Sequence, residues 1–75
     1  MARRHRKIRR LDVVAVTADL KNWGLLRGQV GTVVEVLAPG TFEVEFSDDN
    51  GRTYAPRALR EDQLMLLHYQ PRKAA

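Results

Sequence analysis

The chain has 75 residues and no cysteine, which limits it to one small domain with a thin core and excludes disulfide bonds and thiolate metal sites. No apolar run approaches the roughly 18 residues that cross a bilayer, and no apolar signal-peptide segment follows the basic N-terminus. These features predict a cytoplasmic, bacterial-type protein.

The net charge of +4 is unevenly distributed along the chain. Between residues 11 and 70, five basic residues stand against nine acidic ones, so this part is acidic. All of the positive excess lies at the two ends. The C-terminal tail carries Arg72 and Lys73, and the N-terminal arm carries Arg3, Arg4, Arg6, Lys7, Arg9 and Arg10.

The N-terminal third predicts an arm, a strand and a long loop. Residues 1–10 contain one strongly apolar residue, Ile8, and are expected to form a disordered basic arm. A run rich in β-branched residues predicts the first strand over 11–17. Asparagine and glycine then indicate a long loop over 18–28. The leucines expected to hold this loop from inside are Leu20, Leu25 and Leu26.

A central hairpin is the strongest pattern in the sequence. Its first strand is expected over 29–37 and its three-residue connection over 38–40, with Gly40 suited to the left-handed conformation that such hairpins need. Its second strand, 41–47, alternates Phe or Val with Glu, which places the apolar side chains on one face and the acidic ones on the other.

The remaining residues predict two short strands. An Asn-Gly turn over 48–51 leads into a fourth strand over 52–55, which Pro56 ends because proline cannot donate to a ladder. A single 3₁₀ turn is expected over 58–62 and a fifth strand over 64–67. The expected core is Val14, Val16, Val30, Val34, Val36, Phe42, Val44, Phe46, Leu59, Leu64 and Leu66.

These elements together predict an all-β fold. Five short strands with one long loop are typical of a small SH3-like barrel, here over 11–69, with a single 3₁₀ turn before the last strand. Residues 70–75 are expected to form a disordered tail.

Acidic residues collect on the outer face of the predicted hairpin. Glu35 is expected opposite Glu43, where like charges repel across the strand pair, and Glu45 lies one step further along. The face is either a solvated polar surface or a site for a basic partner, which includes the protein's own arm. The pairs expected in this register are Leu37–Thr41, Val36–Phe42 and Glu35–Glu43.

Two aromatic residues are candidates for contact with a partner. Trp23, the only tryptophan, lies beside Gly24 in the long loop and either anchors a partner or folds back over the barrel. Tyr54 falls on the outward side of the expected fourth strand. The full set of expected partner-binding residues is Trp23, Leu25, Arg27, Glu35, Glu43, Glu45 and Tyr54.

The basic arm has three interpretations. Six cations would give a salt slope of roughly −4 to −5 on nucleic acid if all engaged phosphates, although no aromatic residue in the arm supports base stacking. The arm is otherwise a solvated or docking tail, or a product of start-site choice. The residues that would contact phosphates are Arg3, Arg4, Arg6, Lys7, Arg9 and Arg10.

Catalytic chemistry has little support in the sequence. Neither His5 nor His68 has a partner at metal or triad spacing. The adjacent acidic residues 48–49 and 61–62 are expected to form turns, and the glycines at 24, 28 and 31 precede a strand rather than the helix of a phosphate loop. We therefore expect a non-enzymatic binding module, with no cofactor or metal, that is a monomer or a weak oligomer.

Four segments carry a resemblance to a known family. They are Leu11–Val16, Gly24–Val36, Phe42–Phe46 and the Asp62-Gln63-Leu64 run. Together they resemble a family of small bacterial proteins of unknown function with an SH3-like fold. The resemblance covers about residues 11–67 and implies a single-domain, cytoplasmic protein-binding module. Because some members are associated with toxin–antitoxin-like gene pairs, it also implies an antitoxin-like partner encoded nearby. The basic arm lies outside the shared region.

Two wider resemblances involve the glycines that follow the first strand. Gly28, Gly31 and Val33 after this strand are similar to the KOW module, which implies the alternative function of RNA or DNA binding, with the arm on phosphates. The Gly31–Val34 run is also similar to small SH3-like subunits of photosynthetic electron-transport complexes.

Overall fold

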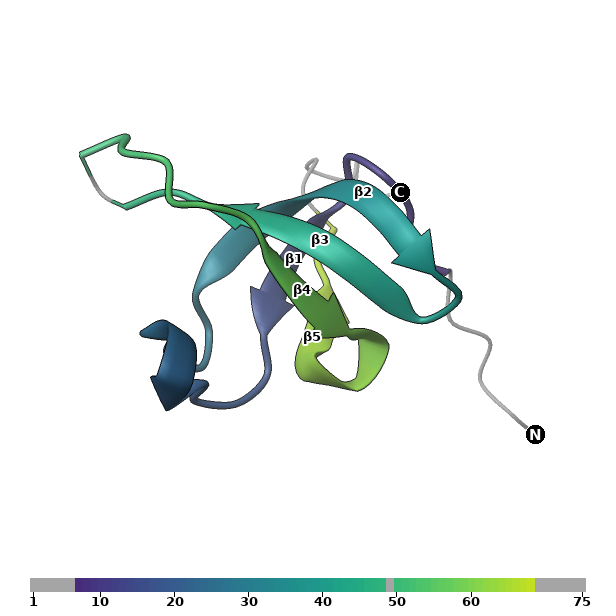
Figure 1. The fold of residues 1–75 in the computed structure, drawn as a ribbon, viewed down its shortest axis with the longest axis horizontal. Helices are drawn as coiled ribbons and strands as arrows, with labels where there is room; N and C mark the ends of the chain where they lie inside the picture. The colour runs from purple at the N-terminus through teal and green to yellow at the C-terminus, as the bar shows by residue number, and fades with distance from the viewer. Residues whose placement is uncertain (1–6, 49, 69–75) are drawn as a thin grey trace, which may run out of the picture.

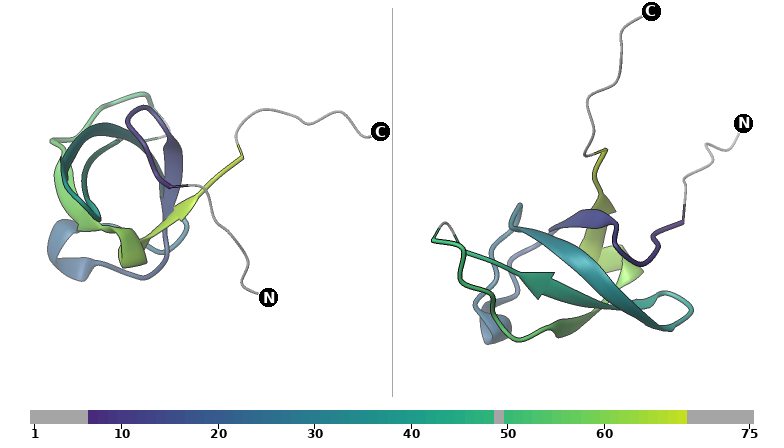
Figure 2. Two further views of the ribbon diagram at one scale, coloured as in Figure 1. Left: turned by 90° about the vertical axis from the view of Figure 1, so that its right-hand side faces the viewer. Right: turned by 90° about the horizontal axis from the view of Figure 1, so that it is seen from above.

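In the computed structural model, which describes residues 7–48 and 50–68, five antiparallel strands form one sheet. The sheet order is β4-β3-β2-β1-β5, and the sheet curls around so that its inner face encloses the core (Figures 1 and 2). The expected all-β fold with five strands is confirmed. The elements are β1 (Val13–Val16), η1 (Lys21–Trp23), β2 (Val30–Ala38), β3 (Thr41–Phe46), β4 (Arg57–Arg60), η2 (Glu61–Gln63) and β5 (Leu64–Leu66).

Strand β3 supplies the centre of the core. Phe42, Val44 and Phe46 are buried, whereas Glu43 and Glu45 between them are half-buried on the outer face, as the alternating sequence predicts. The predicted core residues found buried are Val14, Val16, Phe42, Val44, Phe46, Leu59 and Leu64.

The inward face of β2 differs from the predicted one. Gly31 and Val33 are buried, whereas Val30 and Val36 are 48% and 42% exposed, so the core assignment of these two valines was wrong. The core assignment of Val34 and Leu66 was also wrong, because both are only half-buried.

Close packing against β3 explains why a glycine occupies an inward position of β2. Gly31 lies opposite Phe46, and a Cβ at Gly31 would lie 2.8 Å from the Glu45 carbonyl oxygen and from two ring carbons of Phe46. The phenyl ring thus takes the space that a side chain on residue 31 would need. Gly31 has no side chain to fill its inward position on β2, and the Phe46 ring of β3 fills this space instead.

Two irregularities in the β2–β3 ladder shift its register. The predicted pairs Glu35–Glu43 and Val36–Phe42 are confirmed. The predicted pair Leu37–Thr41 was wrong, because Ala38 pairs with Thr41. The strand therefore runs on to Ala38, and the turn contains Pro39 and Gly40, the latter with the expected positive φ of 80°.

The fourth strand lies later in the chain than predicted. Residues 52–55 belong to the β3–β4 connection, where Thr53 forms an isolated bridge with Ser47. β4 begins directly after Pro56, not before it. Because β4 uses the chain up to Arg60 to pair with β3, the 3₁₀ turn begins only at Glu61. This turn directly precedes β5, as expected.

The long loop between β1 and β2 contains a second 3₁₀ turn, η1, which the sequence does not predict. A bridge between Leu20 and Leu25 closes the loop around η1. Leu25 is buried and Leu20 packs against the core, but Leu26 is 63% exposed, so the inward placement of Leu26 was wrong.

The chain approaches β1 through a tight turn. Ile8 packs against the core, and Arg10 Nε donates to the Val34 carbonyl oxygen at 3.3 Å. Leu11 has a φ of 75°, and its N–H donates to the Val33 carbonyl at 2.7 Å. The expected arm at 1–10 falls largely outside the described residues, as does the expected tail at 70–75.

Candidate partner-binding site

Trp23 stands between two hollows in the surface of the protein. The first has a volume of about 460 Å³ and lies between η1 and the residues Arg60 and Gln63. The second has a volume of about 380 Å³ and includes Tyr54 and Arg57. The Trp23 side chain borders both hollows and is 37% exposed. It is thus accessible to a partner on either side.

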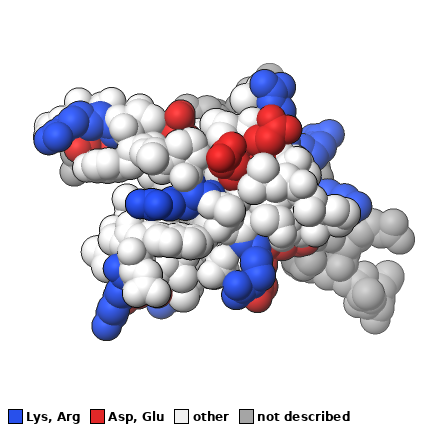
Figure 3. Space-filling model, viewed as in Figure 1, with Lys and Arg blue, Asp and Glu red and all other residues white. Residues whose placement is uncertain are grey.

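Loops at one end of the sheet form the second hollow. The β1–β2 loop with η1 and the β3–β4 connection extend toward the same end of the molecule (Figure 1). The exposed aromatic residues Trp23 and Tyr54 line this hollow together with Asp48, and the nearly buried Leu25 and Phe46 lie behind them. Figure 3 shows Lys and Arg side chains between the β3–β4 connection and η1. The site is therefore an apolar surface bordered by cations.

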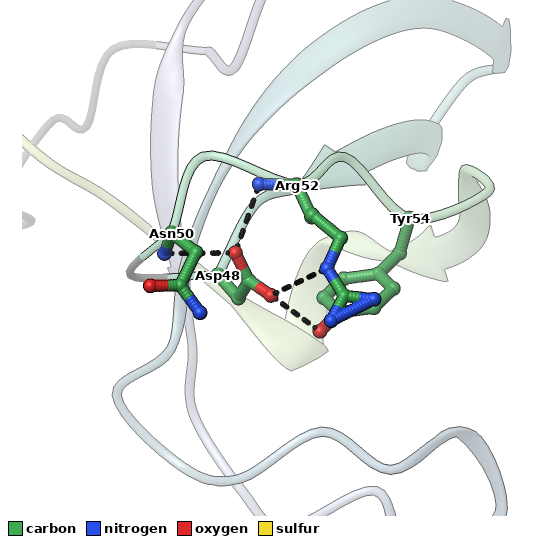
Figure 4. A network of polar contacts seen from close by, with 4 residues as sticks. All are labelled: Asp48, Asn50, Arg52 and Tyr54. Atoms are coloured by element: carbon green, nitrogen blue, oxygen red, sulfur yellow. Dashed lines mark hydrogen bonds and ion pairs between the residues drawn. The ribbon is translucent and has the colours of Figure 1, made fainter.

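A hydrogen-bond network centred on Asp48 shapes the β3–β4 connection (Figure 4). Asp48 Oδ1 accepts the backbone N–H groups of Asn50 and Arg52 at 2.9 and 2.8 Å. Asp48 Oδ2 accepts the Tyr54 hydroxyl at 3.0 Å and lies 3.7 Å from Arg52 Nε. The aspartate forms the turn, as expected of an acidic residue here, and it also holds the Tyr54 ring beside the second hollow.

These contacts shift the pKa of both partners. The backbone N–H of Arg52 is the main cause that lowers the pKa of Asp48, with further lowering by the Tyr54 hydroxyl and the Asn50 N–H. The same carboxylate raises the pKa of Tyr54, because it accepts the phenol hydrogen bond and opposes a second negative charge. The pair therefore keeps a carboxylate acceptor and a phenol donor at neutral pH.

We expect Asp48→Asn to lower stability at neutral pH and to flatten its decline in acid. A depressed carboxyl pKa contributes stability above the unfolded value of about 3.9, and this stability is lost as pH falls through the folded value. Urea unfolding of both proteins between pH 7 and pH 2 should therefore show two curves that converge below about pH 4. Glu61→Gln is a control that removes one exposed acidic charge elsewhere. A difference between Asp48→Asn and wild type that stays constant across this range would contradict the expectation.

The acidic face lies apart from the two hollows. Glu35 is exposed opposite Glu43, and Glu45 pairs with Thr32. Figure 3 shows acidic side chains gathered over β2 and β3. None of the three glutamates lines either hollow. The structure therefore divides the predicted partner-binding residues between two surfaces.

Two of the predicted partner-binding residues have other places in the structure. Leu25 is 5% exposed and packs in the core, although it is also among the residues that line the second hollow. Arg27 is exposed but lines neither hollow, and its N–H donates to Asp19 Oδ1 at 2.8 Å.

The basic residues of the hollows carry no signal in the sequence. Arg57 was overlooked because the fourth strand was expected to end before Pro56, and Lys21 lay in a stretch expected to be loop. The side chain of Arg60 pairs with Asp62 through Nε and Oδ1 at 3.1 Å. No periodic pattern marks these residues, since they come from separate elements.

The described part of the basic arm offers three cations to solvent. Lys7, Arg9 and Arg10 are exposed; the predicted phosphate contacts Arg3, Arg4 and Arg6 lie outside the described residues. Within residues 7–48 and 50–68 no group of acidic and histidine side chains is arranged to hold a metal ion. The same residues contain no helix with the length and apolarity to cross a membrane.

A comparison with protein families identifies the chain. A family model described as "Domain of unknown function (DUF4926)" matches residues 10–66. The chain belongs to this family. The part that matches DUF4926 contains all five strands, and the resemblance to an uncharacterised family is thereby confirmed. No curated protein and no solved structure matches the chain.

Proposed function

We propose that this DUF4926 protein is a non-enzymatic module, built on an SH3-like barrel, that binds another protein through the surface around Trp23 and Tyr54. One observation carries the proposal. The two aromatic residues that the sequence singles out lie far apart in the chain, yet both border the second hollow. The strand order and the 3₁₀ turn before β5 support the SH3-like assignment.

The chemistry of this surface suits a protein partner. Tryptophan and tyrosine bury a large area at a small entropic cost and dominate the binding energy of many interfaces. Asp48 already holds Tyr54 by a hydrogen bond of 3.0 Å, so less side-chain freedom is lost when a partner binds. The glutamates of the acidic face line neither hollow, and we assign the anchoring contacts to the two aromatic residues.

A selection of random displayed peptides on the full chain tests this function. We expect it to enrich peptides whose affinity falls at least about tenfold on Trp23→Ala, as for a central aromatic anchor. Trp23 lies in an exposed loop, and circular dichroism would check that the variant keeps its fold. Glu43→Gln serves as the control on the acidic face and should leave the affinity unchanged.

Two outcomes would contradict the proposal. Enriched peptides that bind Trp23→Ala as well as wild type would show that this surface is not the site. Peptides lost on Glu43→Gln but kept on Trp23→Ala would move the site to the acidic face.

A further inference from the structure

The charges around Trp23 indicate the kind of partner that this surface accepts. The first hollow contains Lys21 and Arg60, and the second contains Arg57. Each hollow also contains one aspartate, Asp19 or Asp48. The formal charges of the two hollows together give a small positive excess. Which of these charges a ligand would meet depends on which of them are already paired within the protein.

Both aspartates are already engaged by the protein. Asp19 Oδ1 accepts the Arg27 N–H at 2.8 Å, and both oxygens of Asp48 accept hydrogen bonds from the β3–β4 connection. By contrast, neither Lys21 nor Arg57 has an acidic partner among the described residues, whereas Arg60 is paired with Asp62. One cation on each side of Trp23 is therefore available to a ligand.

We propose that the surface binds an extended acidic segment of a partner protein. An apolar residue of this segment packs on Trp23, and acidic residues on either side of it reach Lys21 and Arg57. This inference rests on the proposed function and names its partner. Ion pairs at an exposed site are weak individually, so the apolar contact on Trp23 supplies the anchor and the flanking charges supply the selectivity.

A peptide fits these charges better than a nucleic acid does. A nucleic acid carries a phosphate on every nucleotide, so a strand crossing both hollows would bring negative charge past Asp19 and Asp48. A peptide can place carboxylates at Lys21 and Arg57 and uncharged groups beside the aspartates. The exposed rings of Trp23 and Tyr54 in the second hollow also suit an apolar side chain.

The single tryptophan makes the test direct, because its emission reports on this surface alone. The probe is a synthetic peptide with two glutamates on each side of a central leucine, titrated into the full chain at low salt. Matched peptides carry glutamine or lysine in place of glutamate, and an oligouridylate RNA is titrated in parallel. We expect saturable binding of the glutamate peptide that weakens as salt is added.

Variants of the two free cations complete the experiment. Lys21→Gln and Arg57→Gln should each weaken the glutamate peptide about two- to fivefold, as expected for an exposed ion pair. Arg27→Gln removes a nearby cation that lines neither hollow, and it should leave the affinity unchanged.

Several results would overturn the inference. Equal affinity for the glutamate and glutamine peptides, tighter binding of the lysine peptide, or no binding of the glutamate peptide would each do so. Tighter binding of the RNA with the same dependence on Lys21 and Arg57 would instead make the surface a nucleic-acid site. The displayed-peptide selection judges the proposed function separately. Trp23-dependent peptides that are neutral or basic would keep that function and reject the acidic partner.

Discussion

Replacing Phe46 by alanine should bring the protein close to unfolding at room temperature. Phe46 is 1% exposed and is among the largest fully buried side chains. Truncating such a residue costs about 3–5 kcal/mol, from the lost transfer energy and the cavity that remains. A domain of this size has roughly 5 kcal/mol of stability in total, so the substitution removes most of the free energy of unfolding.

Circular dichroism with thermal and urea unfolding would measure this effect. Phe46→Ala should unfold at a much lower temperature and urea concentration than wild type, with only about 0–2 kcal/mol of stability left. Val30→Ala removes apolar atoms from a side chain that is 48% exposed and should change stability far less. A cooperative Phe46→Ala protein within about 1 kcal/mol of wild type would contradict the burial that we describe.

The second large effect is expected at Gly31. Alanine at this position would place its Cβ 2.8 Å from the backbone oxygen of Glu45 and from the Phe46 ring. Alanine normally stabilises a strand relative to glycine by restricting the unfolded chain. Here the crowding opposes that gain, because a backbone atom cannot move aside as a flexible side chain does. We expect a loss of about 1–3 kcal/mol.

A double-mutant cycle would separate the two contacts of Gly31. In a Phe46→Leu background the aromatic ring is gone, so Gly31→Ala should cost less than in wild type, with a coupling of about 0.5 kcal/mol or more. The part of the cost that remains belongs to the Glu45 carbonyl. Thr32→Ala, on the opposite face of β2, is the control. If Gly31→Ala proves stabilising, the close approach of β2 and β3 is wrong.

The strands differed in how far their sequences predicted them. β3 was predicted well because its alternation of apolar and acidic residues is unbroken and its inner face is fully buried. β2 was not, because β-branched residues occupy both of its faces and two register shifts interrupt the alternation. Gly31 carries no hydrophobic signal, although it faces the core. The position of the Phe46 ring explains why Gly31 faces the core.

The candidate site was predicted in its parts but not in its arrangement. Trp23 and Tyr54 stand out as aromatic residues in polar stretches, so each was recognised as a candidate contact. Their approach to the same hollow depends on how the β1–β2 loop and the β3–β4 connection fold, and local sequence does not determine this. Arg57 has no comparable signal, because Pro56 predicts the end of a strand, whereas in the structure it directly precedes β4.

The pairing of β1 between β2 and β5 has a consequence for how the protein is made. Val14 pairs with Gly31 on one side and with Leu66 on the other. During synthesis β1 can gain its first neighbour early, but its other edge stays open until residue 66 has left the ribosome. A nascent chain stalled before that point presents an unpaired strand edge beside an uncovered core, and such edges recruit other chains. Completion of the last strand therefore protects the newly made protein from aggregation as well as completing the sheet.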